Sequence, residues 1–329
     1  MMHHANISIF VPNIGCPLRC VFCDQRAISG ETKAPAASDV TAICEKNADN
    51  GMETEIAFFG GSFTAVPRDY MVSLLEAAYP FVMSGRVKGI RVSTRPDAVS
   101  PEILDLLKRY GVTSIELGAQ SMIDSVLKAN RRGHSAADVE NASHMISEYG
   151  FSLGLQMMVG MYGDEDPYKG AMDTAKRIAL LCPDTVRIYP TQVIRGTELC
   201  RFWEEGKYIP LELEKAVDIC ADLLLFFEEK GIRVIRNGLH SDSGMQESRV
   251  AGPWHPAFGD LCRSKIYLNR MIEAIGENVT ARILVNPGSL STFIGNGKRN
   301  ISALKQMGKS VIIAGDADVP PGEFRVSKF

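Results

Sequence analysis

The chain has 329 residues, a formal net charge of −3, and 45% apolar and 23% charged residues. Its length allows one barrel-sized domain plus a smaller unit, and its composition is ordinary for a soluble globular enzyme. The charge excludes a surface coated in positive charge, although a local basic patch is compatible with it. Neither a run of 18 apolar residues nor a basic stretch followed by an apolar one occurs. We therefore expect no membrane span, no secretion signal and a cytoplasmic location.

The hydrophobic pattern predicts strands that alternate with helices. Strands are expected at 7–11, 55–59, 90–93, 114–117, 152–159 and 185–189, and helices at 38–47, 68–78, 101–110, near 122, 136–149 and 168–181. Strands alternating with such helices imply parallel pairing through right-handed crossovers. These units in series predict an α/β fold, a partial (β/α)6 TIM-like barrel with its functional residues at the C-terminal strand ends.

The remaining third of the chain predicts a second, smaller unit. After a helix at 213–230 and a strand at 233–236, we expect an irregular segment at 237–264 that lies near the active site, because it mixes glycines, aromatics and histidines. A small α+β unit is expected at 265–329, with strands at 281–285 and 310–314 and helices at 289–294 and 301–307. The barrel domain would then span residues 1–236.

Cysteine spacing gives the strongest chemical signal. Cys16, Cys20 and Cys23 follow the first strand on one loop with C-x3-C-x2-C spacing. Three thiolates can bind three irons of a cubane [4Fe–4S] cluster and leave the fourth iron open for another molecule. Zinc is an alternative, but structural zinc needs four ligands and no fourth cysteine or histidine follows nearby. A further alternative is that three buried cysteines cluster by chance, but Pro17 and Arg19 favour a loop over a buried strand.

The other cysteines indicate a reducing compartment. In a chain of this size, clustered cysteines on a loop favour a reducing cytosol over a disulfide framework. The scattered ones form no second C-x2-C pair, and most are expected to be small apolar core residues. They are Cys44, Cys182, Cys200, Cys220 and Cys262.

The cysteine spacing, with the aromatic Phe22 before the third cysteine, resembles the signature of radical S-adenosylmethionine (SAM) enzymes. The resemblance covers most of the first two hundred residues and implies two cofactors, a [4Fe–4S] cluster and SAM. In that family SAM chelates the open iron, and one electron cleaves its sulfonium to give a 5′-deoxyadenosyl radical. The resemblance also implies an electron donor such as flavodoxin or ferredoxin.

Two strand ends resemble SAM-binding segments of that family. Gly60, Gly61 and Ser62 follow the second strand and resemble the Gly-Gly motif that holds the SAM amino group, with an ordinary tight turn as the alternative. Ser93 stands where relatives usually carry a ribose-binding glutamate, and a serine offers one hydrogen bond without charge. Arg95 could bind the SAM carboxylate, pair with a neighbouring acid or contact substrate.

The next two strands extend the resemblance. It places Gln120 at the SAM ribose and Arg132 at the carboxylate, for which the guanidinium fork is suited. The alternative for Arg132 is a solvated surface position. His134 is expected to be a structural hydrogen bonder rather than a catalyst. Gln156 falls at a ribose-binding position, while Met158 could flank the adenine or fill the core.

The segment 187–199 closely resembles the radical SAM half of the Elongator catalytic subunit, which modifies wobble uridine in tRNA. Segments 94–97 and 132–134 resemble that branch too, and oxygen-independent coproporphyrinogen oxidases are a more distant likeness. The resemblance implies an RNA substrate, in particular tRNA. We expect no acetyltransferase domain, because the chain ends without room for one, so only the radical machinery is carried over. Substrate candidates here are Arg187, Tyr189 and Arg195.

The C-terminal unit offers a second pointer to RNA. Its strand, helix, glycine-rich basic loop, helix and strand resemble a KH RNA-binding unit, with Lys298 and Arg299 as phosphate contacts. Lys298 stands where the second glycine of that loop should be, and a glycine turn with two exposed cations is an equal alternative. Two other functions stay open: radical chemistry on a small molecule or tetrapyrrole, with Trp254 and His255 lining a pocket, and an RNA-binding or scaffold protein without turnover.

Overall fold

The chain forms two compact units in this computed structural model, which describes residues 4–11, 14, 16, 19–24, 33–48, 53–239 and 243–327. The first unit comprises Met1–Glu212 and Phe227–Pro253, and the second comprises Leu213–Phe226 and Trp254–Phe329. The unit boundaries differ from those expected from the sequence, since Leu213–Phe226 groups with the C-terminal part of the chain.

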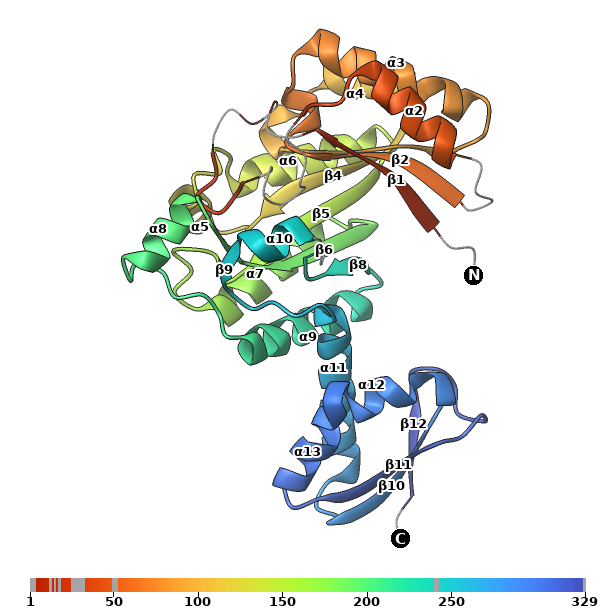
Figure 1. The fold of residues 1–329 in the computed structure, drawn as a ribbon, viewed down its shortest axis with the longest axis vertical. Coiled ribbons are helices and arrows are strands. Elements are labelled where there is room, and N and C mark those ends of the chain that lie inside the picture. Colours follow the sequence, from red (N-terminus) through yellow and green to blue (C-terminus); the bar gives the residue numbers. More distant parts are fainter. Residues whose placement is uncertain are drawn as a thin grey trace. The chain divides into compact units, whose positions relative to one another are not determined.

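A curved, seven-stranded parallel sheet organises the first unit (Figure 1). Its strands follow one another in chain order, each parallel to its neighbours. This arrangement confirms the predicted α/β, partial TIM-like barrel, and the strand predicted at 233–236 joins the six expected barrel strands. The strands are β1 (His4–Val11), β2 (Glu53–Gly60), β3 (Gly89–Thr94), β4 (Val112–Gln120), β5 (Ser152–Val159), β6 (Thr185–Pro190) and β8 (Arg233–Asn237).

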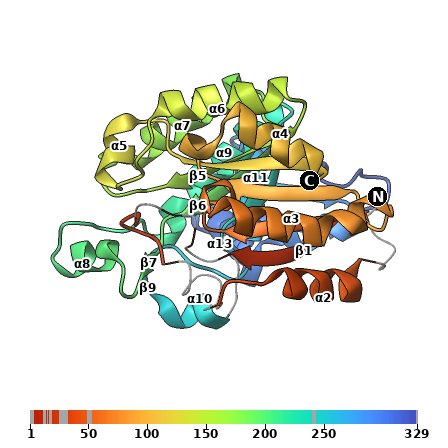
Figure 2. The same ribbon diagram turned by 90° about the horizontal axis from the view of Figure 1, so that it is seen from above.

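Helices connect successive strands close to the predicted positions. Side chains cap three of them: Ser100, Ser135 and Asp166 each accept a backbone N–H from the first turn of the helix that follows. Figure 2 shows α6 and α7 along one side of the sheet, over β4 and β5. The helices are α2 (Ala37–Asn47), α3 (Arg68–Met83), α4 (Pro101–Arg109), α5 (Asp124–Ala129), α6 (Ala136–Glu148) and α7 (Pro167–Leu180).

The two faces of the sheet differ in polarity because side chains alternate along each strand. One face is apolar and buried, with Ile56, Ile90, Ile115, Leu155 and Val186 in neighbouring strands. The alternate residues form what we call the polar face. It includes Glu55, Arg91, Glu116, Gln156 and Arg187.

A smaller layer of the first unit follows β6. The strand β7 (Val193–Ile194) pairs antiparallel with β9 (Arg249–Ala251), and the helices α8 (Glu198–Glu204) and α10 (Ser243–Ser248) lie in the adjoining chain segments. The prediction of irregular structure across 237–264 is therefore wrong. This stretch contains α10, β9 and the start of the 18-residue helix α11 (Phe258–Ile275).

The second unit has its own core beneath a three-stranded sheet. Here β10 (Thr280–Val285) lies between β11 (Ser310–Gly315), to which it is parallel, and β12 (Phe324–Ser327), to which it is antiparallel. The helices are α11, α12 (Leu290–Ile294), α13 (Arg299–Gln306) and the first part of α9 (Leu213–Glu229). This confirms the expected α+β unit, although β12 was not predicted. Buried side chains of Leu268, Met271, Ile283, Phe293 and Leu304 form the core.

Across the described residues, no helix has both the length and the apolar character needed to cross a membrane.

Candidate active site

The cysteine loop is anchored through the backbone of Val21, whose side chain is buried. The Val21 N–H donates to the carbonyl of Asn130 at 3.3 Å, and its carbonyl accepts the Leu199 N–H at 2.7 Å. Asn130 is itself buried, and its Nδ2 donates to the carbonyls of Val126 and Tyr162. The loop is thus tied to the segment after α5 and to the start of α8.

Groups from distant parts of the sequence meet the cysteine sulfurs. The Ser62 backbone amide stabilises the thiolate form of Cys16, and Arg132 Nη1 donates to Cys20 Sγ at 3.0 Å. Burial raises the pKa of the Cys16 thiol, while the Ser62 amide and the charges of Arg95 and Arg132 act in the opposite direction. The end of β2 and two arginines therefore stabilise negative charge on this loop.

The chemistry of the loop fits an iron–sulfur cluster. Cys16, Cys20 and Cys23 are partly exposed, and cysteine thiolates are the ligands that such clusters require. In the described part of the chain no three His, Cys, Asp or Glu side chains already converge on a metal position. The three cysteines therefore stay the predicted cluster ligands.

The glycine pair after β2 has a structural reason. Gly60 has a φ of +115°, and a Cβ on it would lie 2.7 Å from the Val11 carbonyl oxygen of β1. That same oxygen accepts the Gly61 N–H at 3.0 Å. Ser62 Oγ contacts Thr94 Oγ1 at 2.8 Å and accepts the Arg95 N–H at 3.2 Å. This segment is therefore held against the ends of β1 and β3, and its contact with SAM stays a prediction.

A bulge ends β4 and brings two predicted ribose ligands together. The pairing register shifts between Leu117 and Gln120, and Gln120 adopts a φ of 66°. Gln156 Nε2 then donates to Gln120 Oε1 at 3.1 Å. Two side chains hold the bulge: Arg132 Nη2 donates to the Gly118 carbonyl at 2.6 Å, and His134 Nε2 lies 3.3 Å from the Ala119 carbonyl oxygen.

His134 has the structural position expected for it. Burial, helped by the charge of Arg132, lowers the pKa of His134 to about 4, so the ring is neutral at physiological pH. Because the neutral ring can donate from Nε2 to the Ala119 carbonyl, it supports the bulge.

Arg95 pairs with the neighbouring acid, one of the three roles considered for it. Its Nε donates to Asp97 Oδ1 at 2.8 Å and its Nη2 to Asp97 Oδ2 at 2.9 Å. Nη2 also donates to the Arg132 carbonyl at 2.6 Å. Arg95 therefore links the end of β3 to the segment that carries Arg132.

Buried ion pairs that were not predicted from the sequence lie on the polar face. Arg187 Nε lies 2.7 Å from Glu116 Oε2, its guanidinium carbon stands 5.2 Å from the centre of the Phe59 ring, and its Nη1 lies 3.3 Å from the Tyr189 hydroxyl. Burial raises the pKa of Tyr189, so the phenol stays protonated. A second ion pair joins Arg91 Nη2 to Glu55 Oε2 at 3.0 Å. Charged residues at alternate positions of otherwise apolar strands were the available signal.

The remaining candidates in the first unit lie in three settings. Ser93 Oγ is buried and finds no hydrogen-bond partner among the described residues. Met158 pairs in register with Tyr189, which places it on the polar face. Phe22 packs against an apolar cluster that contains Leu199, and Arg195 is exposed after β7.

The second unit carries the other substrate candidates. Arg299 makes a two-bond contact with Glu214, with Nη2 to Oε1 at 2.8 Å and Nη1 to Oε2 at 3.2 Å. Lys298 is exposed with a left-handed φ of 63°. His255 Nδ1 accepts the Ala257 N–H at 3.0 Å, and Trp254 lies just before it in the chain. The substrate roles of these residues stay predictions.

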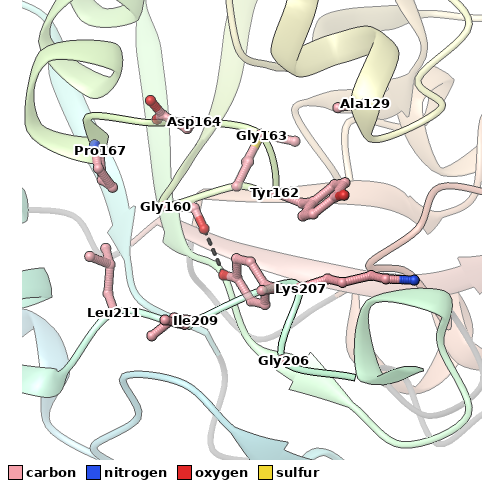
Figure 3. A pocket seen from close by; sticks show the side chains of 12 residues that line it. Ala129, Gly160, Tyr162, Gly163, Asp164, Pro167, Gly206, Lys207, Ile209 and Leu211 are labelled. Carbon is pink, nitrogen blue, oxygen red and sulfur yellow. Dashed lines mark hydrogen bonds between the residues drawn. The ribbon is translucent and has the colours of Figure 1, made fainter. Parts of the chain in front are cut away.

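A cavity of about 460 Å³ lies between the segment after β5 and the segment that connects α8 to α9 (Figure 3). The Tyr208 hydroxyl donates to the Gly160 carbonyl at 2.7 Å across one of its walls. Tyr162, Lys207 and Leu211 also line it, but none of the predicted cluster, SAM or substrate residues does. The cavity is therefore distinct from the candidate active site.

Comparison with family models decides the class of protein. The model of the radical SAM superfamily matches residues 10–175, and that of the radical SAM C-terminal domain matches residues 183–268. This chain belongs to the radical SAM superfamily. Membership confirms the predicted class of cofactors, a [4Fe–4S] cluster and SAM, while the residues that hold them stay predictions.

Three known proteins illustrate the likeness. A tRNA uridine(34) acetyltransferase of Dehalococcoides mccartyi is 26% identical over 252 residues, which cover 66% of this chain and 55% of that protein. An uncharacterized protein of Methanocaldococcus jannaschii is 28% identical over 278 residues, covering 83% and 80%. The structure of archaeal Elp3 from Methanocaldococcus infernus has a TM-score of 0.65 at 22% identity, covering 83% and 63%.

These relatives confirm the expected resemblance to the Elongator branch, and the solved structure shows a shared fold. The chain spans about half the length of the acetyltransferase that it matches.

Proposed function

We propose that this protein is an enzyme that cleaves SAM reductively and uses the resulting radical on RNA, in particular tRNA. Superfamily membership carries the first part of this proposal. The tRNA part draws on the relative from Dehalococcoides mccartyi, a tRNA uridine(34) acetyltransferase. A one-electron donor such as a flavodoxin or ferredoxin would supply the reducing equivalent.

The cofactor-binding roles fall to the residues gathered around the cysteine loop. Cys16, Cys20 and Cys23 would hold the cluster, which with bound SAM supplies a radical able to abstract hydrogen. Gln120 and Gln156 offer adjacent amide groups for ribose hydroxyls, which their mutual hydrogen bond supports.

The glycine segment and Ser93 extend this set. The carbonyl groups of Gly60 and Gly61 suit the SAM amino group, because the Gly61 N–H is already used by β1. Ser93 Oγ is buried without a partner in the described part of the chain, so it is free to bond a ribose hydroxyl.

The polar face would receive the reacting group. Its ion pairs neutralise the buried charges there, so Arg187 acts mainly by fixing Glu116 and the Tyr189 phenol. A protonated Tyr189 beside Met158 offers a hydrogen-bond donor to substrate. These features of the polar face favour a substrate that enters at the C-terminal ends of the strands.

Anaerobic reconstitution tests the reaction. Protein supplied with iron, sulfide and dithionite should convert SAM to 5′-deoxyadenosine, measured by liquid chromatography. Cys16→Ala, Cys20→Ala and Cys23→Ala should each abolish the product, whereas Cys182→Ala, at an exposed cysteine, should not. Wild-type rates in any of the three loop variants would contradict the assignment.

The substrate is tested separately by mass mapping of RNA from cells that lack the protein. We expect one modified nucleoside to disappear, and salt-sensitive retention of tRNA by the purified protein. Tight, salt-insensitive binding of a small molecule or tetrapyrrole, with no RNA retained at low salt, would favour the alternative substrate class.

A further inference from the structure

Arg132 is fixed in place by contacts that do not involve the cysteines. Its backbone N–H donates to the Leu127 carbonyl at 3.0 Å, and its own carbonyl accepts Arg95 Nη2 at 2.6 Å. Its Nη2 donates to the Gly118 carbonyl at 2.6 Å, and only 6% of the residue is exposed. Arg132 is therefore held both at its backbone and at its guanidinium.

This fixed guanidinium is directed at a cluster ligand. With Nη2 committed to Gly118, Nη1 donates to Cys20 Sγ at 3.0 Å. Arg95 has Asp97 as a carboxylate partner, but Arg132 has none among the residues that the structure describes. Within the described part of the chain, the guanidinium that donates to Cys20 is thus not paired with a carboxylate.

A cation that donates to a ligating sulfur favours the more negative, reduced form of an iron–sulfur cluster. Cluster potentials depend on net charge, on hydrogen bonds to the sulfurs and on exposure to solvent. Groups just outside the ligand shell also orient the ligands themselves. The same contact would therefore both orient the Cys20 sulfur and raise the cluster's reduction potential.

We infer that Arg132 is a positioning residue for the cluster, which holds the Cys20 sulfur and makes the cluster easier to reduce. The inference rests on the proposed function, since it needs a cluster at the three cysteines. It is compatible with the SAM carboxylate role predicted from the resemblance. Arg132 Nε is buried and makes no hydrogen bond with the described residues, so a donor stays available for SAM.

The test is a potentiometric titration of the reconstituted cluster, followed by electron paramagnetic resonance without SAM or RNA. Three variants are compared with the wild type: Arg132→Gln, Arg132→Lys and the matched control Arg131→Gln. Arg131 is adjacent in sequence but exposed, and it pairs with Glu198. Iron and sulfide are counted first in each preparation.

Arg132→Gln should lower the ratio of reduced to oxidised cluster about tenfold at a fixed potential, a shift of about 59 mV for a one-electron couple. Arg132→Lys should shift the midpoint in the same direction by less, because its ammonium keeps the charge but cannot span Gly118 and Cys20 together. Arg131→Gln removes the same charge at the surface and should leave the midpoint unchanged.

A wild-type midpoint in Arg132→Gln would overturn the inference, and so would an equal shift in Arg131→Gln. If Arg132→Gln fails to retain iron, Arg132→Lys decides: a lower midpoint supports the inference and a wild-type midpoint overturns it. An unchanged midpoint with weakened SAM binding would assign Arg132 to SAM alone. Wild-type protein that takes up no iron would instead contradict the proposed function, which the iron count reveals before any titration.

Discussion

Removing Glu116 from the polar face should destabilise the first unit strongly. Glu116 and Arg187 lie 2.7 Å apart, with side chains only 4% and 11% exposed. Glu116→Leu would leave the Arg187 cation buried without its carboxylate. Breaking a buried pair in this way costs about 3–5 kcal/mol of unfolding free energy. Because Arg187 keeps its contacts with the Tyr189 hydroxyl and the Phe59 ring, we expect a loss near the lower end of this range, about 3 kcal/mol.

Urea unfolding followed by tryptophan fluorescence can measure this loss. The chain has two tryptophans, so a Trp254→Phe background leaves Trp203 as the reporter in the first unit. The urea midpoint of Glu116→Leu should fall while the slope of the transition stays constant. A double variant with Arg187→Met should recover most of the stability, because an apolar pair replaces the ion pair without leaving a charge behind.

The exposed pair of Asp173 and Lys176, with side chains 46% and 62% exposed, supplies the control. Asp173→Asn should change the unfolding free energy by less than about 0.5 kcal/mol. A loss below about 1 kcal/mol in Glu116→Leu would contradict this prediction, because it would mean that Arg187 is well solvated. No recovery in the double variant would also contradict it, because the loss would then not come from an unpaired Arg187 charge.

Three further predictions concern individual residues. Gly60→Ala should cost about 1–3 kcal/mol in urea unfolding, because its positive φ and the nearby β1 carbonyl oppose a Cβ, whereas Gly85→Ala meets no atom within 4 Å and should cost less. His134, with a pKa near 4 when folded and about 6.5 when unfolded, must stay neutral in the fold, so stability should fall by about 1–2 kcal/mol between pH 7 and pH 5. His134→Gln should flatten that pH dependence, and an unchanged slope would contradict the shift. Asn300→Ala should lower the unfolding free energy of the second unit, measured in urea, by about 2–3 kcal/mol, because the buried Asn300 amide donates to Ser264 and to a carbonyl of α12, and a loss below about 0.5 kcal/mol would contradict this.

The barrel could be predicted from the sequence because its strands and helices alternate with strong, regular apolar spacing. Each segment is local, so the pattern of Ser152–Val159 or Arg68–Met83 carries its own signal. The cysteine loop gave an equally clear signal, since three cysteines fall within eight residues. Local patterns thus fixed both the fold class and the chemical class of the site.

Contacts between distant segments could not be predicted in the same way. Arg132 and Cys20 are 112 residues apart, and only the folded sheet brings them to 3.0 Å. The alternate charges Glu116 and Arg187 could have been recognised as a polar face, but their pairing depends on the strand order. The sequence showed only that such residues were present.

The prediction of irregular structure at 237–264 was wrong for a different reason. The glycines, aromatics and histidines of this stretch suggested irregular structure, but α11 begins within it, at Phe258. The apolar spacing from Phe258 through Leu261 and Cys262 was the helical signal. The residues typical of loops before Phe258 therefore obscured the helical apolar spacing that follows it.

Metal analysis of oxygen-free protein tests whether the three loop sulfurs hold a cluster with one open iron. We expect about four irons per chain, an electron paramagnetic resonance signal after reduction, and a change in that signal when SAM is added. Cys16→Ser, Cys20→Ser and Cys23→Ser should each lose that signal. Colourless, iron-poor protein, zinc in the cysteine loop, or a signal indifferent to SAM would contradict the claim.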